Sequence, residues 1–215
     1  MITVSDDVVD VDSALRRGEV FCPGCSARLR PWGWARPRPI RYDCRDPRVV
    51  RVHRPRRGRC AGCGATHVLL HVLLAARRAD AAAVIAAAVE AKIASGWGHR
   101  KIAVLLGRAA STVRGWLRAF AACVDRIVER FTALVLRDAP DAAVVWAAPV
   151  GSAPAAALSA LLAYAAGLGR RFGTVDTVTW VHSGIAVSNG RLFCAGFWAA
   201  MVQHESALPA EIPVR

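Results

Sequence analysis

Apolar residues recur at helical spacing through the middle of the chain. Between Asp80 and Gly96 an apolar stripe repeats every three or four residues, and the glycine ends it. The stripe consists of Val84, Ile85, Ala88, Val89 and Ile93. The run HRKIAVLL predicts a second, short helix that ends at Gly107, and residues 110–137 predict a third, longer one whose length allows a bend.

The first seventy residues show a different pattern, in which short β-branched runs stand between prolines and glycines. Strand character is found in residues 40–42, 49–53 and 67–70. Ser13 is a candidate cap for a short helix, ALRR, that Gly18 ends. Residues 1–12 are acidic, and we expect them to be a disordered tail.

Beyond residue 137 the pattern is helical again. Residues 153–168 predict one helix, and residues 207–215 predict a loose tail. Residues 174–193 are ambiguous: TVDTVTWV is rich in β-branched residues, which favours a strand, yet Val178, Val181 and Ile185 share one helical face. We favour a helix with Asn189–Gly190 as its C-cap.

The uncharged segment 142–169 raises the question of a membrane span. Pro149, Gly151 and Pro154 interrupt it, and the part after Pro154 is shorter than the roughly 20 residues that a span needs. We therefore expect a buried helix and no membrane partner.

Two Cys-x-x-Cys pairs carry the clearest chemistry. Cys22/Cys25 and Cys60/Cys63 lie in CPGCS and CAGCG, and two such turns together supply a tetrahedral Cys₄ site for structural Zn²⁺. The remaining cysteines, Cys44, Cys123 and Cys194, make the total odd, and the N-terminus has no apolar signal segment. We expect a reduced, cytoplasmic protein, with Cys123 and Cys194 buried. The histidines His53, His67 and His71 are expected to be bystanders rather than ligands.

These patterns predict a mainly α protein with a small β zinc ribbon, of the α+β class. The expected order is an N-terminal Cys₄ zinc ribbon, a helix-turn-helix bundle and C-terminal helices. The predicted boundaries are a disordered tail (1–12), a zinc ribbon with an arginine-rich loop (13–75), a helix-turn-helix domain (79–137), a C-terminal helical region (138–206) and a loose tail (207–215).

The positive charge is concentrated in the first two thirds of the chain. The net charge is +13 and the pI is near 10.8, but 27 of the 29 basic residues are arginine, which a GC-rich genome also favours. From Leu15 to Arg78 there are sixteen arginines against three acids, whereas the charge beyond Asp138 is nearly balanced. This distribution predicts a polyanionic partner.

The run from Arg100 to Phe120 fits a helix-turn-helix. Ile102, Ala103 and Leu106 form one inner face, Gly107 supplies the turn, and the second inner face consists of Val113, Trp116, Leu117 and Phe120. The outward polar residues are typical of a helix that contacts base edges and phosphates in a major groove. Candidate DNA-binding residues are Arg100, Lys101, Arg108, Ser111, Thr112, Arg114 and Arg118, together with Arg54, Arg56 and Arg57 of an exposed loop expected around residues 36–57. The alternative is an ordinary helical hairpin with solvated arginines.

Trp32 and Trp34 flank Gly33 beside the first cysteine pair. They would suit a stacking platform for bases. Because the predicted ribbon has few other apolar residues, we expect them to cover its core instead.

The arrangement resembles the N-terminal part of bacterial insertion-sequence transposases, in which a zinc ribbon precedes a helix-turn-helix. The matching residues are Arg57, Arg59, Cys60, Cys63, Gly64, Thr66 and His67, followed by residues 102–116. Residues 22–38 also resemble the CPGC-x-x-x-LRPWGWARPR opening of small actinobacterial proteins of unassigned function. Ala109 departs from the Ser or Pro that often begins the second helix of the motif, and no catalytic domain follows.

The resemblance implies a double-stranded DNA-binding protein, either a transcriptional regulator or an accessory of a mobile element, located at the nucleoid. Its partners would be DNA and either a transposase or a second copy of the chain as a homodimer. We expect no catalysis, because the five acids from Asp138 onward do not form the carboxylate triad of a transposase and no phosphate-binding loop is present. The rival hypotheses are a zinc-ribbon module that docks onto another protein and a non-catalytic or truncated transposase subunit.

Overall fold

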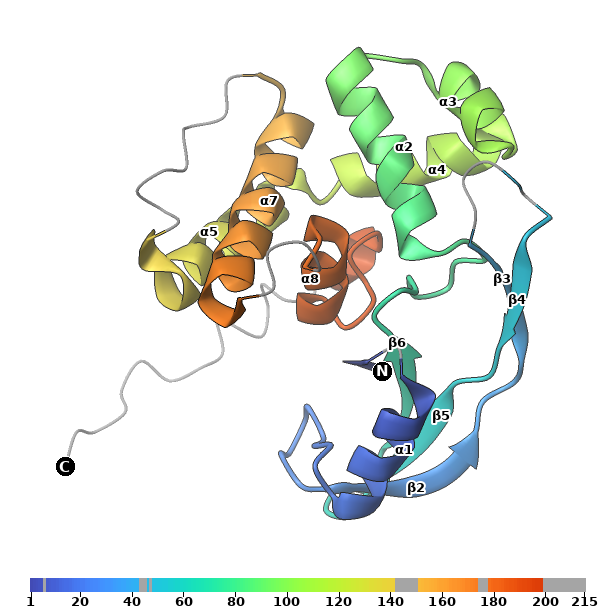
Figure 1. Ribbon diagram of the computed structural model, residues 1–215, viewed down its shortest axis with the longest axis vertical. Helices are drawn as coiled ribbons and strands as arrows, with labels where there is room; N and C mark the ends of the chain where they lie inside the picture. Colours follow the sequence, from blue (N-terminus) through green and yellow to red (C-terminus); the bar gives the residue numbers. More distant parts are fainter. Residues whose placement is uncertain (6, 43–45, 47, 142–150, 174–177, 199–215) are drawn as a thin grey trace.

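The computed structural model describes residues 1–5, 7–42, 46, 48–141, 151–173 and 178–198. Within these ranges a small sheet lies at one end of the molecule and the helices from α2 onward lie at the other (Figure 1). The described part is a mixed α/β structure, which agrees with the predicted α+β class. No helix in it combines the length and the apolar character that a membrane span requires.

The sheet has four strands in an order that does not follow the sequence. They are β1 (Ile2–Val4), β6 (Thr66–His71), β5 (Arg56–Cys60) and β2 (Leu29–Trp34), with β1 parallel to β6 and the other pairs antiparallel. Helix α1 (Val8–Arg17) buries Val11 and Leu15 against Leu29 and Leu69 of this sheet. This small apolar cluster also contains two cysteines, Cys22 and Cys60.

The expectation that residues 1–12 form a disordered tail is wrong. Ile2 and Val4 pair with β6, and α1 begins at Val8 after Asp7, whose carboxylate accepts the N–H groups of Val9 (2.7 Å) and Asp10 (3.2 Å). The acidic composition was interpreted as a sign of disorder. A carboxylate at a helix N-terminus, however, caps and stabilises the helix. The predicted end at Gly18 is confirmed, with φ at 71°.

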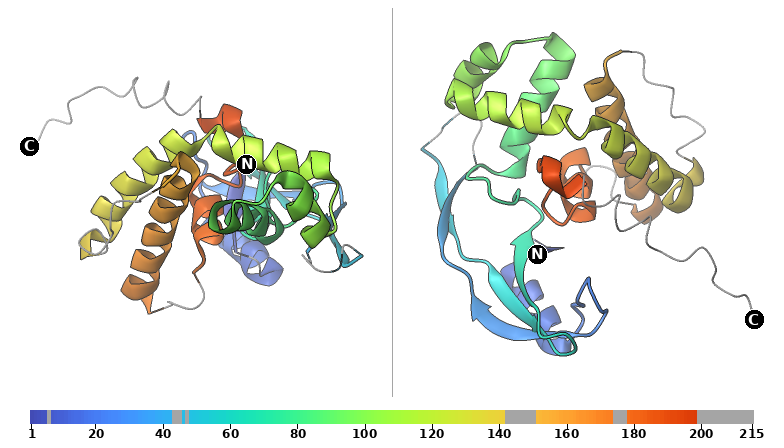
Figure 2. Two further views of the ribbon diagram at one scale, coloured as in Figure 1. Left: turned by 90° about the horizontal axis from the view of Figure 1, so that it is seen from above. Right: turned by 180° about the vertical axis from the view of Figure 1, so that it is seen from behind.

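Strands β2 and β5 continue into a second antiparallel pair, β3 (Arg38–Arg41) and β4 (Val50–His53). The N–H of Ala35 donates to the carbonyl of Pro55 at 2.8 Å between the two ladders. Strands β2, β3, β4 and β5 therefore form two consecutive antiparallel ladders, called the hairpin below, that curve along an edge of the molecule (Figure 2). Part of the arginine-rich loop expected over residues 36–57 is paired strand, namely residues 38–41, 50–53 and 56–57. Val50 and Val52 are β-branched residues of the kind that favours strands.

Helices α2 (Ala82–Ser95), α3 (His99–Leu106) and α4 (Ala110–Ala121) follow the predicted pattern. Gly96 and Gly107 end the first two in the left-handed conformation, as expected from their positions. The predicted inner faces are buried, namely Ile102, Ala103, Leu106, Val113, Trp116 and Phe120, with Leu117 partly buried.

The third predicted helix is divided in two. Helix α4 ends at Ala121, and α5 (Val124–Asp138) begins after Cys123, whose thiol donates to the carbonyl of Ala119 at 3.0 Å. Cys123 is buried as predicted, and Cys194 is half-buried, whereas Cys44 lies outside the described residues. No glycine or proline marks this break, so the periodicity alone could not locate it.

The C-terminal helices are α7 (Ala153–Phe172) and α8 (Trp180–Val187). Helix α7 lies beside α5 in both views, and the rings of Phe131 and Tyr164 contact across them at 5.6 Å (Figure 2). The helix favoured within residues 174–193 is confirmed at residues 180–187. After its last turn, the N–H of Gly190 donates to the carbonyl of Ile185 at 2.8 Å. The predicted tail, residues 207–215, lies outside the described residues.

The helices and the hairpin share a core. Ile40 of β3 and Leu70 of β6 belong to the large apolar cluster that α2, α4, α5, α7 and α8 build. The Thr3 hydroxyl donates to the carbonyl of Ile185 at 3.1 Å, so α8 also contacts β1.

Candidate metal centre and basic surface

The two cysteine turns have the same local geometry. In residues 22–27 and in residues 60–65, the N–H of the first cysteine donates to the carbonyl five residues later, at 2.8 Å in both. The residue after the second cysteine is left-handed in each turn, with φ of 56° at Ser26 and 73° at Gly64. The turns are therefore two copies of one knuckle, and each begins with a buried cysteine and ends with an exposed one.

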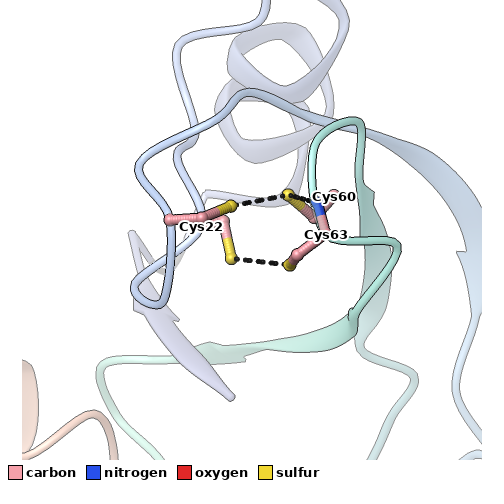
Figure 3. A group of neighbouring side chains, drawn as sticks. Cys22, Cys60 and Cys63 are labelled. Carbon is pink, nitrogen blue, oxygen red and sulfur yellow. Dashed lines mark hydrogen bonds between the residues drawn. The ribbon is translucent and has the colours of Figure 1, made fainter.

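The four sulfurs of these knuckles point toward one another. All of them lie within 4.8 Å of each other. Cys22 Sγ lies 3.7 Å from Cys63 Sγ (Figure 3), and Cys25 Sγ lies 3.4 Å from Cys60 Sγ. A tetrahedral ion with bonds of about 2.3 Å to sulfur separates its ligands by about 3.8 Å. The cluster of Cys22, Cys25, Cys60 and Cys63, called the cysteine cluster below, can therefore hold a metal ion.

Backbone N–H groups favour thiolates in this cluster. The N–H of Cys63 donates to Cys60 Sγ at 3.4 Å and is the main reason that the pKa of Cys60 falls to about 6. For Cys63, the N–H of Ala65 lowers the pKa, but the neighbouring sulfurs outweigh it and raise the pKa to about 11. Such crowding of negative charge is relieved by a cation at the centre.

His67 lies next to the cluster but outside the set of four. Its Nε2 is 3.3 Å from Cys22 Sγ, and burial lowers its pKa, which favours the neutral ring. A side chain that hydrogen-bonds to a metal ligand orients that ligand, and His67 is placed to do so for Cys22. The prediction that the histidines are bystanders does not anticipate this contact.

Close packing fixes the second knuckle against the first. A Cβ added at Gly62 would lie 2.9 Å from the Cβ of Ala27 and 3.5 Å from Cys25 Sγ. Only glycine therefore fits at this position without displacing the opposite knuckle.

Most of the predicted DNA-binding residues of the helices lie on the surface. Arg100, Lys101, Ser111, Arg114 and Arg118 are exposed, and Thr112 is half-buried. Arg114 and Arg118 of α4 line a hollow of about 300 Å³ together with Lys92 of α2 and His99 of α3. Basic side chains of α2 and α4 and the imidazole of His99 thus line one hollow, together with apolar residues such as Leu117 and Phe120.

Gly115 leaves an opening on this surface. It lies in the middle of α4 between Arg114 and Trp116, it is exposed, and a Cβ added to it would meet no heavy atom within 4 Å. Glycine inside a helix costs about 1 kcal/mol relative to alanine. A binding partner that approaches the α4 backbone closely would explain its use here.

The prediction that Arg108 contacts DNA phosphates is wrong. Its side chain is 2% exposed, its Nε is 2.6 Å from Asp80 Oδ1, and its Nη1 donates to the carbonyl of Leu106 at 2.9 Å. Asp80, equally buried, also accepts the Nε–H and one Nη2–H of Arg41 from β3 at 3.0 and 2.9 Å. Through Asp80, the two ion pairs join β3 of the hairpin to the turn between α3 and α4. Arg108 and Asp80 lie too far apart in the sequence for this contact to be predicted.

The three arginines of the hairpin that were predicted to bind DNA differ in their exposure to solvent. Arg54 is exposed and Arg57 is half-buried. The prediction for Arg56 is wrong, because its side chain is 10% exposed and its Nε donates to Asp12 of α1 at 2.7 Å. Arg56 therefore anchors the hairpin to α1.

Trp32 and Trp34 do not cover the core, contrary to our expectation. They remain 48% and 40% exposed on β2. The core beneath is filled instead by Leu29, Leu69 and α1, which extends the short helix predicted at residues 14–17 back to Val8.

Comparison with protein-family models, curated proteins and solved structures finds no match. The resemblance to insertion-sequence transposases therefore stays a prediction.

The N-terminus of α4 lacks a side-chain cap. Ala109 has the extended backbone of a cap residue, with φ −62° and ψ 136°, but offers no acceptor. We expect Ala109→Ser to raise the free energy of unfolding by about 1 kcal/mol, because its hydroxyl accepts an N–H of the first turn. Urea titration measures this, with Ala94→Ser on the exposed side of α2 as the control. Unchanged stability in Ala109→Ser would contradict the prediction.

Proposed function

We propose that this protein binds double-stranded DNA through α4 and that Zn²⁺ in the cysteine cluster stabilises the N-terminal sheet. The observation that carries the proposal is that Arg114 and Arg118 of α4, both exposed, line one hollow together with Lys92 of α2 and His99 of α3. The apolar side of the same helix is buried, so the cationic side is free to contact a ligand.

Zinc is the metal we assign to the cysteine cluster. Four thiolates form a soft ligand set that suits zinc or iron, and two knuckles that close all four positions are typical of structural zinc. A closed site leaves no position for substrate, so the metal acts on stability. Elemental analysis that finds iron in place of zinc would contradict the assignment.

In the proposed complex, α3 and α4 form a helix-turn-helix whose second helix enters the major groove. Ser111, Thr112 and Arg114, near the N-terminus of α4, face base edges. Arg118, one turn later, lies nearer the backbone, and Arg100 and Lys101 contact phosphates. Gly115 allows the α4 backbone to approach the DNA.

We further propose a role as a regulator or as an accessory protein of a mobile element at the nucleoid, without catalysis of its own. The resemblance to transposase N-terminal regions supports it, and a transposase or a second copy would be the protein partner. The rival is a protein-docking module, for which the exposed Val104 and Leu105 of α3 offer an apolar surface.

Arg114→Ala tests the assignment of α4. On a duplex selected from a random pool, we expect a loss of about 1–3 kcal/mol in binding, and little change on random duplex, because base contacts give specificity. Replacing Arg54 and Arg57 together should weaken both alike, because this change removes charge only. Fluorescence anisotropy at fixed salt measures both.

Two further variants sharpen this test. Gly115→Glu has room for its side chain and should keep the fold, yet it places a carboxylate in the interface and should abolish duplex binding. Arg126→Ala removes the same charge from the exposed side of α5 and should leave binding unchanged. Equal loss in Arg114→Ala and Arg126→Ala would show that charge alone, and not the position on α4, governs binding, whereas no loss in either would favour the protein-docking rival.

A further inference from the structure

The hollow beside α4 is lined from two helices, α2 and α4. Residues three, four or seven positions apart on a helix lie on one side of it, and the lining follows this spacing on both helices. On α2 it consists of Val89, Lys92 and Ile93, and on α4 of Arg114, Leu117, Phe120, Arg118 and Ala121. Gly98, His99 and Pro154 complete it. The hollow therefore extends along one side of α4, next to the residues proposed to face DNA.

Much of this lining is apolar. Val89 and Phe120 are buried, and Ile93 and Leu117 are half-buried. With a volume of about 300 Å³, the hollow is at the lower end of the range of small-molecule sites, which are mostly apolar with a few polar groups. A phosphate is strongly hydrated and gains nothing from apolar walls. Duplex DNA would therefore use the basic residues of the hollow and leave its apolar part unmatched.

The charged side chains of the hollow all have the same sign. Lys92, Arg114 and Arg118 are exposed, and no acid accompanies them in the lining that the structure describes. None of the three belongs to an ion pair between described residues. The Nζ of Lys92 donates to the carbonyl of Gly96 at 3.5 Å, a neutral acceptor that does not balance its charge. A small anion with an apolar body matches both the charge and the apolar walls.

We propose that the hollow binds a small organic anion that consists of one carboxylate and an unbranched apolar chain. Arg114 and Arg118 would hold the carboxylate, because a guanidinium group can pair with it through two parallel hydrogen bonds. Ile93 and Leu117 would cover the chain. The proposed function assigns the same two arginines to DNA, and the inference rests on it in one respect: the bound anion should exclude the duplex.

Isothermal titration calorimetry of the full-length, zinc-loaded protein tests the site without DNA. The probes are octanoate, acetate, which lacks the apolar chain, and octylammonium, which carries the opposite charge. We expect octanoate to bind with acetate and octylammonium at least about tenfold weaker, because each of these lacks one of the two matched parts. Failure of octanoate to bind would overturn the inference, and so would equal binding of octylammonium.

Ala121→Leu tests the position of the site. Ala121 is exposed and lines the hollow, so a leucine side chain there takes space from the ligand without entering the core. We expect octanoate affinity to fall about tenfold or more, because at least two methylene groups of the chain lose their contact with the walls. Ala94→Leu, on the exposed side of α2 and outside the lining, is the control and should keep the affinity within about twofold.

Thermal denaturation of both leucine variants checks that they remain folded. Octanoate affinity in Ala121→Leu equal to that of the unaltered protein would overturn the location of the site. Equal losses in Ala121→Leu and Ala94→Leu would overturn it as well.

Fluorescence anisotropy with a labelled duplex measures the exclusion. Octanoate at about ten times its dissociation constant should weaken duplex binding about tenfold, because two ligands that exclude each other reduce one another's affinity in proportion to occupancy. Acetate at the same concentration is the control for ionic strength. Ala121→Leu should bind the duplex normally and lose most of the octanoate effect. Unchanged duplex affinity in the unaltered protein at that octanoate concentration would overturn the exclusion.

Failure of this inference is distinguishable from failure of the proposed function, because the calorimetric test contains no DNA. A protein that binds octanoate but no duplex would contradict the proposed function and support the ligand site. A protein that binds the duplex but no octanoate would support the proposed function and overturn the inference.

Discussion

Removal of zinc is expected to unfold the N-terminal sheet and to leave the helices from α2 onward folded. Among the described residues, the apolar cluster under the sheet has six buried members, and two of them, Cys22 and Cys60, belong to the cysteine cluster. So small a core cannot offset the loss of chain entropy by itself. Structural zinc sites typically contribute about 10–16 kcal/mol of binding free energy at neutral pH, and that free energy becomes folding free energy.

Purified protein should contain about one zinc per chain. Cys60→Ser should lose the metal, and hydrogen exchange should show rapid exchange in β2, β5 and β6 with continued protection in α2 and α5. Cys194→Ser is the control, because Cys194 is half-buried and lies outside the cluster, and it should keep full zinc. A Cys60→Ser protein with one zinc and an unchanged melting temperature would contradict the cysteine cluster as the metal site.

Asp80→Ala is expected to reduce the free energy of unfolding by about 3–5 kcal/mol. Asp80 and Arg108 are both almost fully buried, and removal of the carboxylate leaves the Arg108 guanidinium without its counter-charge inside the protein. The same change frees Arg41, which connects β3 to the start of α2. The loss should therefore exceed that for any exposed ion pair.

Chemical denaturation measures this loss. Glu129→Ala, which breaks the exposed pair with Arg126, is the matched control and should cost about 0.5 kcal/mol or less. Arg108→Ala should destabilise less than Asp80→Ala, because Asp80 keeps Arg41 as a partner. If Asp80→Ala and Glu129→Ala reduced the free energy of unfolding by similar small amounts, the buried ion pair would not stabilise the contact between the hairpin and the helices.

Features governed by neighbouring residues could be predicted from the sequence. Spacings of a few residues determine three of these features: the cysteine pairs, the glycines that end α2 and α3, and the inner faces of α3 and α4. The approach of the two knuckles was also predictable, because a four-thiolate site requires it.

Features that depend on distant partners could not be predicted. The roles of Arg56 and Arg108 were misassigned because Asp12 and Asp80, which pair with them, lie 44 and 28 residues away. Pairing of β1 with β6 joins positions almost seventy residues apart, so an acidic N-terminus gave no sign of it. The exposure of Trp32 depends in turn on α1 filling the core in its place.

The salt dependence of duplex binding tests the central proposal most directly. Each phosphate that the protein neutralises releases counterions, so the logarithm of the binding constant falls linearly with the logarithm of the salt concentration. If about six phosphates are contacted, the slope should be near −5. We expect that slope for the full-length, zinc-loaded protein on duplex DNA, and a slope near zero would contradict the assignment of its positive surface to DNA.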